Sequence, residues 1–151
     1  MTVRLIETEE ERELRDDLEL YKNSRSKSCR KYLEYTIKNC KDPSLLRYLA
    51  TQIAENEALN YFEPLIADNC YAPYYILEEL TSSRNPLTRA CVAFNLNTPA
   101  GSVLMLKNDE NEYVRLIASK NPNLPRSGIL TRFFERINHF INYLKCLLGF
   151  N

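Results

Sequence analysis

The side chains that most often perform catalysis or bind metal are few and scattered in this sequence. There is one histidine, His139, so no pair of histidines is present to hold a metal ion. The carboxylate neighbours Asp16 and Asp17, and Glu78 and Glu79, are adjacent in sequence, and adjacent residues of a helix point about 100° apart. The glycine-rich loops that bind phosphate groups are absent. We therefore expect no catalytic residue, no metal site and no cofactor.

The five cysteines also argue against redox or metal chemistry. They are odd in number and form no C-x-x-C pair, a pattern that predicts reduced thiols, each buried separately. They stand at Cys29, Cys40, Cys70, Cys91 and Cys146.

Two arginines are candidate binding residues because they occupy the same position of a sequence repeat. Arg89 and Arg115 are 26 residues apart. Asp109 stands six residues before Arg115, and Ser83 stands six residues before Arg89. We expect hydrogen bonds between repeats, and the alternative is a row of arginines that contacts phosphate groups.

Tyrosines form a second group of candidates. Eight of the ten tyrosines lie between Tyr21 and Tyr75, and three of them, Tyr71, Tyr74 and Tyr75, surround one predicted corner. An exposed tyrosine offers a large contact area with a polar tip, which suits a protein interface. Packing within short helices explains the same cluster equally well, so both interpretations stand.

The elements that must position these residues repeat along the chain. The pattern N-x-x-x-P occurs at 69–73, 95–99 and 121–125, a spacing of 26 residues, and a fourth copy at 39–43 lies 30 residues before the first of these. Asn is at ease in the left-handed conformation that ends a helix, and Pro suits the first turn of the next helix. Each copy therefore predicts a tight corner between two helices.

The residues between the corners predict short helices at about 86–94, 99–107 and 112–120. Asp42 and Thr98, each directly before a proline, are predicted N-caps. Helices of this length are marginal alone, because isolated helices shorter than about 12 residues are unstable in water. The units must therefore stack and share a core.

Two stretches, N-P-L-T-R-A-C-V-A-F-N-L-N-T-P at 85–99 and E-Y-V-R-L-I-A-S-K-N-P-N-L-P at 112–125, resemble the leucine-rich repeat variant family. That family is a short relative of HEAT repeats, in whose units an arginine at the position of Arg115 often pairs with an acid about six residues earlier, which here is Asp109. The resemblance covers about two thirds of the chain; it is good over 85–131, fair over 59–84 and weak over 29–58. It implies an all-α fold, a right-handed α-solenoid of about four short two-helix HEAT-like units. For function it implies the general role of such arrays as interaction surfaces.

Helices at both ends are predicted to cap the array as parts of one structural domain. Residues 9–21 predict an acidic helix, followed by a polar linker at 23–28, and residues 126–148 predict a long amphipathic helix. The chain thus divides into an N-terminal cap with its linker, the repeat array and a C-terminal cap, at 1–28, 29–125 and 126–151. The C-terminal helix could alternatively lie on an acidic membrane or pair with a second copy.

The distribution of charged residues along the sequence bears on the kind of partner that the protein could bind. Twenty Lys and Arg residues balance twenty Asp and Glu residues. The charges are nevertheless segregated, since residues 1–20 and 48–83 are acidic and residues 21–47 and 84–151 are basic. In a stacked array such blocks become patches, which either steer a charged partner or neutralise each other.

We expect a non-catalytic adaptor or scaffold that binds another protein through Tyr71, Tyr74, Tyr75, Arg89 and Arg115. The alternative is a nucleic-acid-associated module that uses the basic segment 84–132. A third possibility, a DNA glycosylase built on HEAT-like repeats, would need an acidic residue over a basic cleft, and no residue is singled out for that role. The acidic N-terminus and the lack of a long apolar run predict a cytoplasmic protein without a transmembrane segment.

Overall fold

The computed structural model describes residues 8–24, 26–125 and 136–137, and all regular structure in these residues is helical. The prediction of an all-α protein is therefore confirmed for the described part of the chain. Almost all of the predicted helix at 126–148 lies outside the described residues. The elements are α1 Glu9–Ser24, α2 Lys27–Asn39, α3 Pro43–Ala54, the 3₁₀-helix η1 Glu57–Phe62, α4 Glu63–Asp68, α5 Tyr74–Leu80, α6 Pro86–Phe94, α7 Ala100–Leu106 and α8 Glu112–Ala118.

The predicted short helices are present with nearly the predicted bounds. Asn85 and Asn111 cap α6 and α8, because each side-chain oxygen accepts a hydrogen bond from a backbone N–H of the first turn. Asp42 caps α3 in the same way, as predicted, and Pro43 follows it in the first turn. Thr98 is not an N-cap. Pro99 holds that position before α7, and the Thr98 hydroxyl instead donates to the Val92 carbonyl at 2.6 Å.

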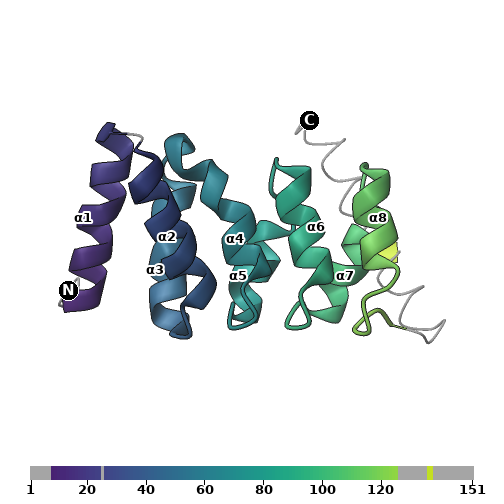
Figure 1. Ribbon diagram of the computed structural model, residues 1–151. Helices are drawn as coiled ribbons and strands as arrows, with labels where there is room; N and C mark the ends of the chain where they lie inside the picture. Colours follow the sequence, from purple (N-terminus) through teal and green to yellow (C-terminus); the bar gives the residue numbers. More distant parts are fainter. Residues whose placement is uncertain (1–7, 25, 126–135, 138–151) are drawn as a thin grey trace.

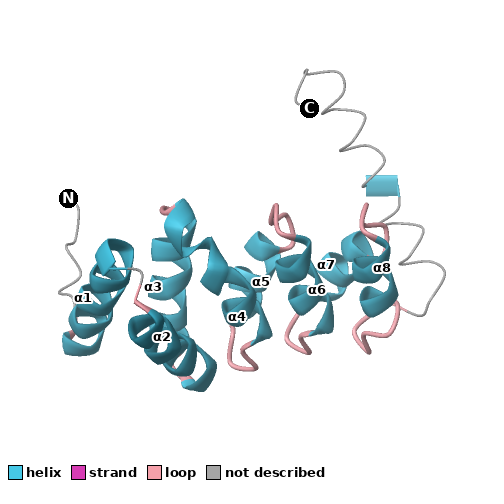
Figure 2. Cartoon of the chain, turned by 45° about the horizontal axis from the view of Figure 1, so that its top comes forward, coloured by secondary structure: helices cyan, strands magenta, loops and turns pink. Residues whose placement is uncertain are grey.

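The helices follow one another in chain order along the molecule (Figure 1). Helices α2, α4, α6 and α8 contact one another in turn, and α3, α5 and α7 each pack against members of this row. Figure 2 shows the same order from a second direction, with the loops gathered at the helix ends. Each helix therefore contacts mainly the elements that are near to it in sequence.

Two groups of buried side chains form the core. The first joins α1 to α5 through large residues such as Leu18, Leu33 and Phe62, all of which are buried. The second runs from Ala67 to Ala118 and is built from smaller residues. Leu80 packs against both groups, so the apolar interior continues along the row.

The linker after the N-terminal helix is shorter than predicted. Helix α1 continues through Asn23 to Ser24, and α2 begins at Lys27, so most of the predicted linker at 23–28 is helical. Ser26 stops the extension of α1 into α2 because its side chain accepts from the backbone N–H of Ser28 and caps α2. Part of the predicted linker therefore acts as a helix cap, which its polar composition alone does not predict.

Two of the corner asparagines, Asn69 and Asn95, do not adopt the left-handed conformation that the sequence suggested. Asn69 and Asn95 have φ of −68° and ψ of 124° and 131°, which is extended backbone. The side chain explains the residue type. The Asn95 amide donates to the carbonyls of Ala67 and Asn69 at 2.8 and 2.9 Å, in the preceding corner, while its oxygen accepts from the Asn97 N–H. Each corner is therefore bonded to the one before it.

The same bonds recur in the neighbouring corners. Asn121 donates to the carbonyls of Ala93 and Asn95 at 2.8 and 3.1 Å, 28 and 26 residues earlier, as Asn95 does. Asn69 donates to Ile37 and Cys40, which lie 32 and 29 residues earlier. These separations are longer than 28 and 26 residues, so the segment between Ile37 and Asn69 contains extra residues relative to the regular repeat.

The first copy of N-x-x-x-P differs from the others. Asn39 ends α2, and its amide donates to the carbonyl of Tyr35 in the same helix. Cys40 takes the extended position that Asn69 and Asn95 hold in later corners. In this copy the extended corner position is therefore one residue later than the asparagine of the motif.

Candidate functional site

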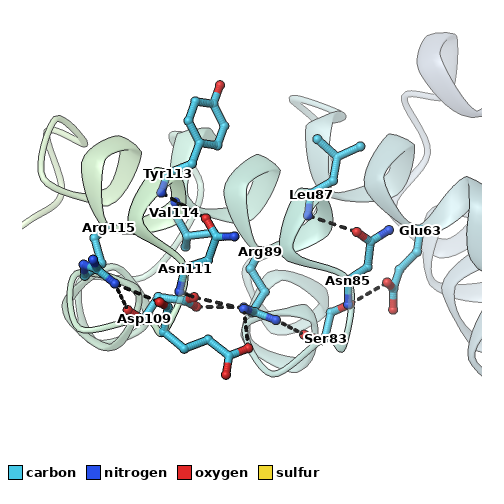
Figure 3. Close-up of polar contacts among 11 residues, drawn as sticks. Glu63, Ser83, Asn85, Leu87, Arg89, Asp109, Asn111, Tyr113, Val114 and Arg115 are labelled. Carbon is cyan, nitrogen blue, oxygen red and sulfur yellow. Dashed lines mark hydrogen bonds and ion pairs between the residues drawn. The ribbon is translucent and has the colours of Figure 1, made fainter.

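Arg89 joins α6 to the turn before α8. Its Nε and Nη2 atoms donate to the two carboxylate oxygens of Asp109 at 2.7 and 2.9 Å, and Nη2 also bonds to Glu110 at 3.0 Å (Figure 3). Its Nη1 donates to the Ser83 carbonyl at 2.8 Å. The side chains of Arg89 and Asp109 are only 9% and 7% exposed. This geometry matches the expected hydrogen bonding between repeats.

The expected link between Arg115 and the side chain of Asp109 is wrong in detail. Arg115 donates from Nη1 to the backbone carbonyls of Asp109 and Glu110 at 2.8 and 2.9 Å. Ser83 is likewise contacted by Arg89 through its backbone carbonyl. In both repeats the arginine thus reaches a main-chain oxygen six residues earlier, which leaves the Asp109 carboxylate to Arg89.

The electrostatics of Asp109 follow from these contacts. Burial alone would raise the pKa of the carboxyl group, but the hydrogen bonds from Arg89 and from the Asn111 backbone, with the nearby positive charges, hold the pKa below its ordinary value. The pKa of Arg89 is raised, chiefly by its hydrogen bond to Asp109. Both groups are charged at neutral pH.

Glu63 occupies the equivalent repeat position in the preceding unit, 26 residues before Arg89. Its Oε2 accepts from the hydroxyls of Ser83 and Thr88 at 2.6 and 2.8 Å. Polar contacts therefore continue from Glu63 through Ser83 and Arg89 to the turn before α8 (Figure 3). This polar chain joins neighbouring units, and four of the five N–H groups of Arg89 are engaged within it.

The tyrosine cluster lies at the corner before α5 and at the start of that helix. Tyr71 and Tyr74 are exposed, whereas Tyr75 is half-buried and packs against the first core group. The rings of Tyr74 and Tyr75 meet edge to face with centroids 5.6 Å apart. Two of the three tyrosines therefore expose contact area to solvent, and part of the side chain of Tyr75 is exposed as well.

A second exposed surface was not among the sequence candidates. The end of η1, helices α4, α6 and α8, and the corners that follow these helices present four rows of residues, with members 26 residues apart within each row. We call these residues the exposed face: Tyr61, Leu87 and Tyr113; Leu65, Cys91 and Ile117; Asp68, Phe94 and Lys120; and Cys70, Leu96 and Pro122. The first, third and fourth rows are exposed and the second is half-buried.

In α6 the members of the first three rows, Leu87, Cys91 and Phe94, follow the spacing i, i+4 and i+7, which places them on one side of the helix. Phe94 and Leu96 are each 68% exposed, and Tyr61, Leu87 and Tyr113 are 53%, 57% and 59% exposed. Apolar side chains of this size are normally buried, and several together mark an interaction surface. Ten of the twelve positions are apolar, aromatic or cysteine, and the other two are Asp68 and Lys120.

Two hollows indent the exposed face. One, of about 210 Å³, lies among Asp68, Leu87, Cys91, Phe94, Tyr113 and Ile117. The other, of about 380 Å³, is bordered by Phe94, Leu96, Ile117, Lys120 and Pro122. Phe94 and Ile117 border both, so the hollows adjoin along the seam between α6 and α8.

The cysteines are free thiols in the described residues, and their burial differs from the prediction. Cys40 is buried, Cys29 and Cys91 are half-buried and Cys70 is exposed, while Cys146 lies outside the described residues. Burial, with a smaller contribution from the charge of Asp68, raises the pKa of Cys91 to about 11. The Cys91 thiol is therefore protonated at neutral pH.

The signal for the exposed face was present in the sequence. The register already aligned Leu65, Cys91 and Ile117 as one apolar position, and the same step of 26 aligns Tyr61, Leu87 and Tyr113. An apolar position in a repeat is equally compatible with burial, so exposure could not be inferred. The burial of Arg89 could not be inferred either, because a repeated position in the sequence does not show whether its side chain is buried.

Comparisons with known proteins do not add a family. No family model, curated protein or solved structure matches the chain. Among the described residues, no helix is long and apolar enough to cross a membrane. No group of three or more His, Cys, Asp or Glu side chains in the same part of the chain is placed to hold a metal ion.

Proposed function

We propose that the chain is a right-handed α-solenoid of about four short HEAT-like units, similar to the leucine-rich repeat variant family, and that it binds another protein without catalysis. The repeated bonds of Asn95 and Asn121 support the solenoid, because equivalent side chains reach equivalent carbonyls 26 and 28 residues earlier. Contacts limited to neighbouring units are the defining property of such arrays.

The single observation that carries the functional proposal is the exposed face. Large apolar side chains recur there at one spacing and remain open to solvent, as at Leu87 and Phe94. Hollows of about 210 and 380 Å³ lie between them and offer places for the side chains of a partner. The partner-binding surface then centres on this face, with Tyr71 beside it at the corner after α4.

Nucleic-acid binding through Arg89 has weaker support. The Arg89 guanidinium is almost fully engaged by Asp109, Glu110 and Ser83, and a phosphate would have to displace these contacts. We therefore propose a protein partner in preference to a nucleic acid.

The test is an affinity capture from native lysate with the full chain and with a Leu87→Asp/Tyr113→Asp variant. Both positions are exposed, so charge should be tolerated by the fold, and circular dichroism would check this. A protein retained by the wild type after nuclease treatment, and lost from the variant, supports the proposal. A Glu78→Lys variant on α5 serves as control and should retain the partner. Retention that ends with nuclease treatment, or that survives the double variant, would contradict it.

A further inference from the structure

The charges of the exposed face are arranged so that the face is complementary to itself. The row of Asp68, Phe94 and Lys120 crosses α4, α6 and α8, and α6 contacts both of its neighbours. Phe94 therefore lies between an acidic and a basic side chain. A two-fold axis that passes Phe94 in the plane of the interface, and runs across the row, brings Asp68 of one copy to Lys120 of the other. The same pair forms again on the far side of the axis.

The apolar rows obey the same symmetry. The row of Leu65, Cys91 and Ile117 lies on one side of the charged row, and the row of Cys70, Leu96 and Pro122 lies on the other. An axis in this direction places each of these rows over the same row of the second copy, with the order of its members reversed. Leu96, which is 68% exposed, then faces Leu96 of the second copy, and Leu65 of one copy faces Ile117 of the other. Surfaces of this kind form the isologous contacts of symmetric dimers.

From this arrangement we infer that the exposed face binds a second copy of the same chain about a two-fold axis at Phe94. The inference rests on the proposed function in placing protein binding at this face, and it names the partner. The exposed rings and aliphatic side chains around Phe94 lose contact with water in such a dimer. The Asp68 and Lys120 pairs fix the direction in which the copies meet. If the two charged rows ran in the same direction, Asp68 would face Asp68 and Lys120 would face Lys120, and like charges would repel.

The first experiment measures the molar mass of the full chain by sedimentation velocity and light scattering, from about 1 µM to about 1 mM. A reversible dimer is expected, and Phe94→Asp should weaken it by at least about tenfold, because it places two negative charges at the axis. Glu78→Lys, an exposed charge reversal on α5, should leave the dimer unchanged. A wild-type chain that stays monomeric throughout this range would overturn the inference.

The second experiment tests the two-fold arrangement with charge exchange. Asp68→Lys and Lys120→Asp, taken separately, should each weaken the dimer by at least about tenfold, since each places like charges at both symmetric pairs. An equimolar mixture of the two variants should restore association, because every pair then joins a lysine and an aspartate. Single variants that dimerise as well as the wild type, or a mixture that fails to associate, would overturn the inference.

The outcomes separate the inference from the proposed function. A monomeric chain that still retains a lysate protein through Leu87 and Tyr113 overturns the dimer and leaves the interaction module in place. A dimer that follows the charge-exchange rule, in a chain that retains no other protein, supports the inference and contradicts the proposed binding of a different partner.

Discussion

Arg89 binds both carboxylate oxygens of Asp109 across two units, with nitrogen–oxygen distances of 2.7 and 2.9 Å and both side chains less than a tenth exposed. Such a two-point bond fixes geometry as well as charge. It ties α6 to the turn that starts α8, at the side of the molecule away from the exposed apolar rows. Its main consequence is therefore for stability.

Replacing Arg89 by Ala should lower the free energy of unfolding by at least about 2 kcal/mol, because the change strands the buried Asp109 carboxylate. Urea unfolding at neutral pH measures the loss. Arg84→Ala, at an exposed arginine of the same segment, is the matched control and should cost less than about 0.5 kcal/mol. Unchanged stability of Arg89→Ala, together with lost nucleic-acid binding, would return the phosphate-contacting alternative to first place.

The contribution of Asp109 should depend on pH. Its pKa is lowered in the folded state, so the stability that it supplies is complete above the unfolded-state pKa of about 3.9 and is lost as the pH falls through the folded value. The difference in unfolding free energy between the wild type and Asp109→Asn should therefore be constant between about pH 5.5 and 7 and shrink below about pH 4. Urea unfolding of both proteins across this range measures it. A difference that grows on acidification would mean that Asp109 is not held by Arg89.

Asn95→Ala should cost about 2–3 kcal/mol, since the carbonyls of Ala67 and Asn69 each lose the bond from the Asn95 amide and the N–H of Asn97 loses its acceptor. Asn39→Ala removes an exposed amide that bonds within its own helix, and it should cost less than about 0.5 kcal/mol. Thermal and urea unfolding of the two variants would give the comparison. Equal losses would show that the bonds between corners contribute no more than a local one.

Cys91 should react slowly with iodoacetamide at pH 8, because its pKa of about 11 leaves the thiol protonated. Cys70 is exposed and should be alkylated first. The rate at Cys91 should rise steeply as the pH approaches about 11. Mass spectrometry of the alkylated peptides measures the two rates separately. Alkylation of Cys91 at pH 8 as fast as that of Cys70 would contradict the burial of this thiol on the exposed face.

The sequence allowed the helices to be located because their ends depend on local chemistry. Asn85, Asn111 and Asp42 cap helices through backbone groups two or three residues away, and such bonds need no information about distant parts of the chain. Thr98 shows where this reasoning fails. Its hydroxyl bonds to Val92, six residues earlier, in place of the following helix.

The candidate residues divide in a similar way. The spacing of 26 residues identified Arg89 and Arg115 as equivalent, yet only the fold shows that Arg89 takes the carboxylate of Asp109 and Arg115 its backbone carbonyl. Tyr71 and Tyr74 are exposed, as an interface would require, whereas Tyr75 is shared with the core. Whether they bind a partner stays a prediction.

The sequence by itself determined the helical class, the repeat spacing and most helix ends, because periodicity and caps act over a few residues. The tertiary structure decided which repeated residues are buried and which are open. Arg89 is charged and enclosed, while Phe94 is apolar and 68% exposed, the reverse of what composition would suggest. The physical reason is that burial depends on what packs against a side chain from the neighbouring units. A sequence repeat identifies equivalent positions but does not show which groups surround them.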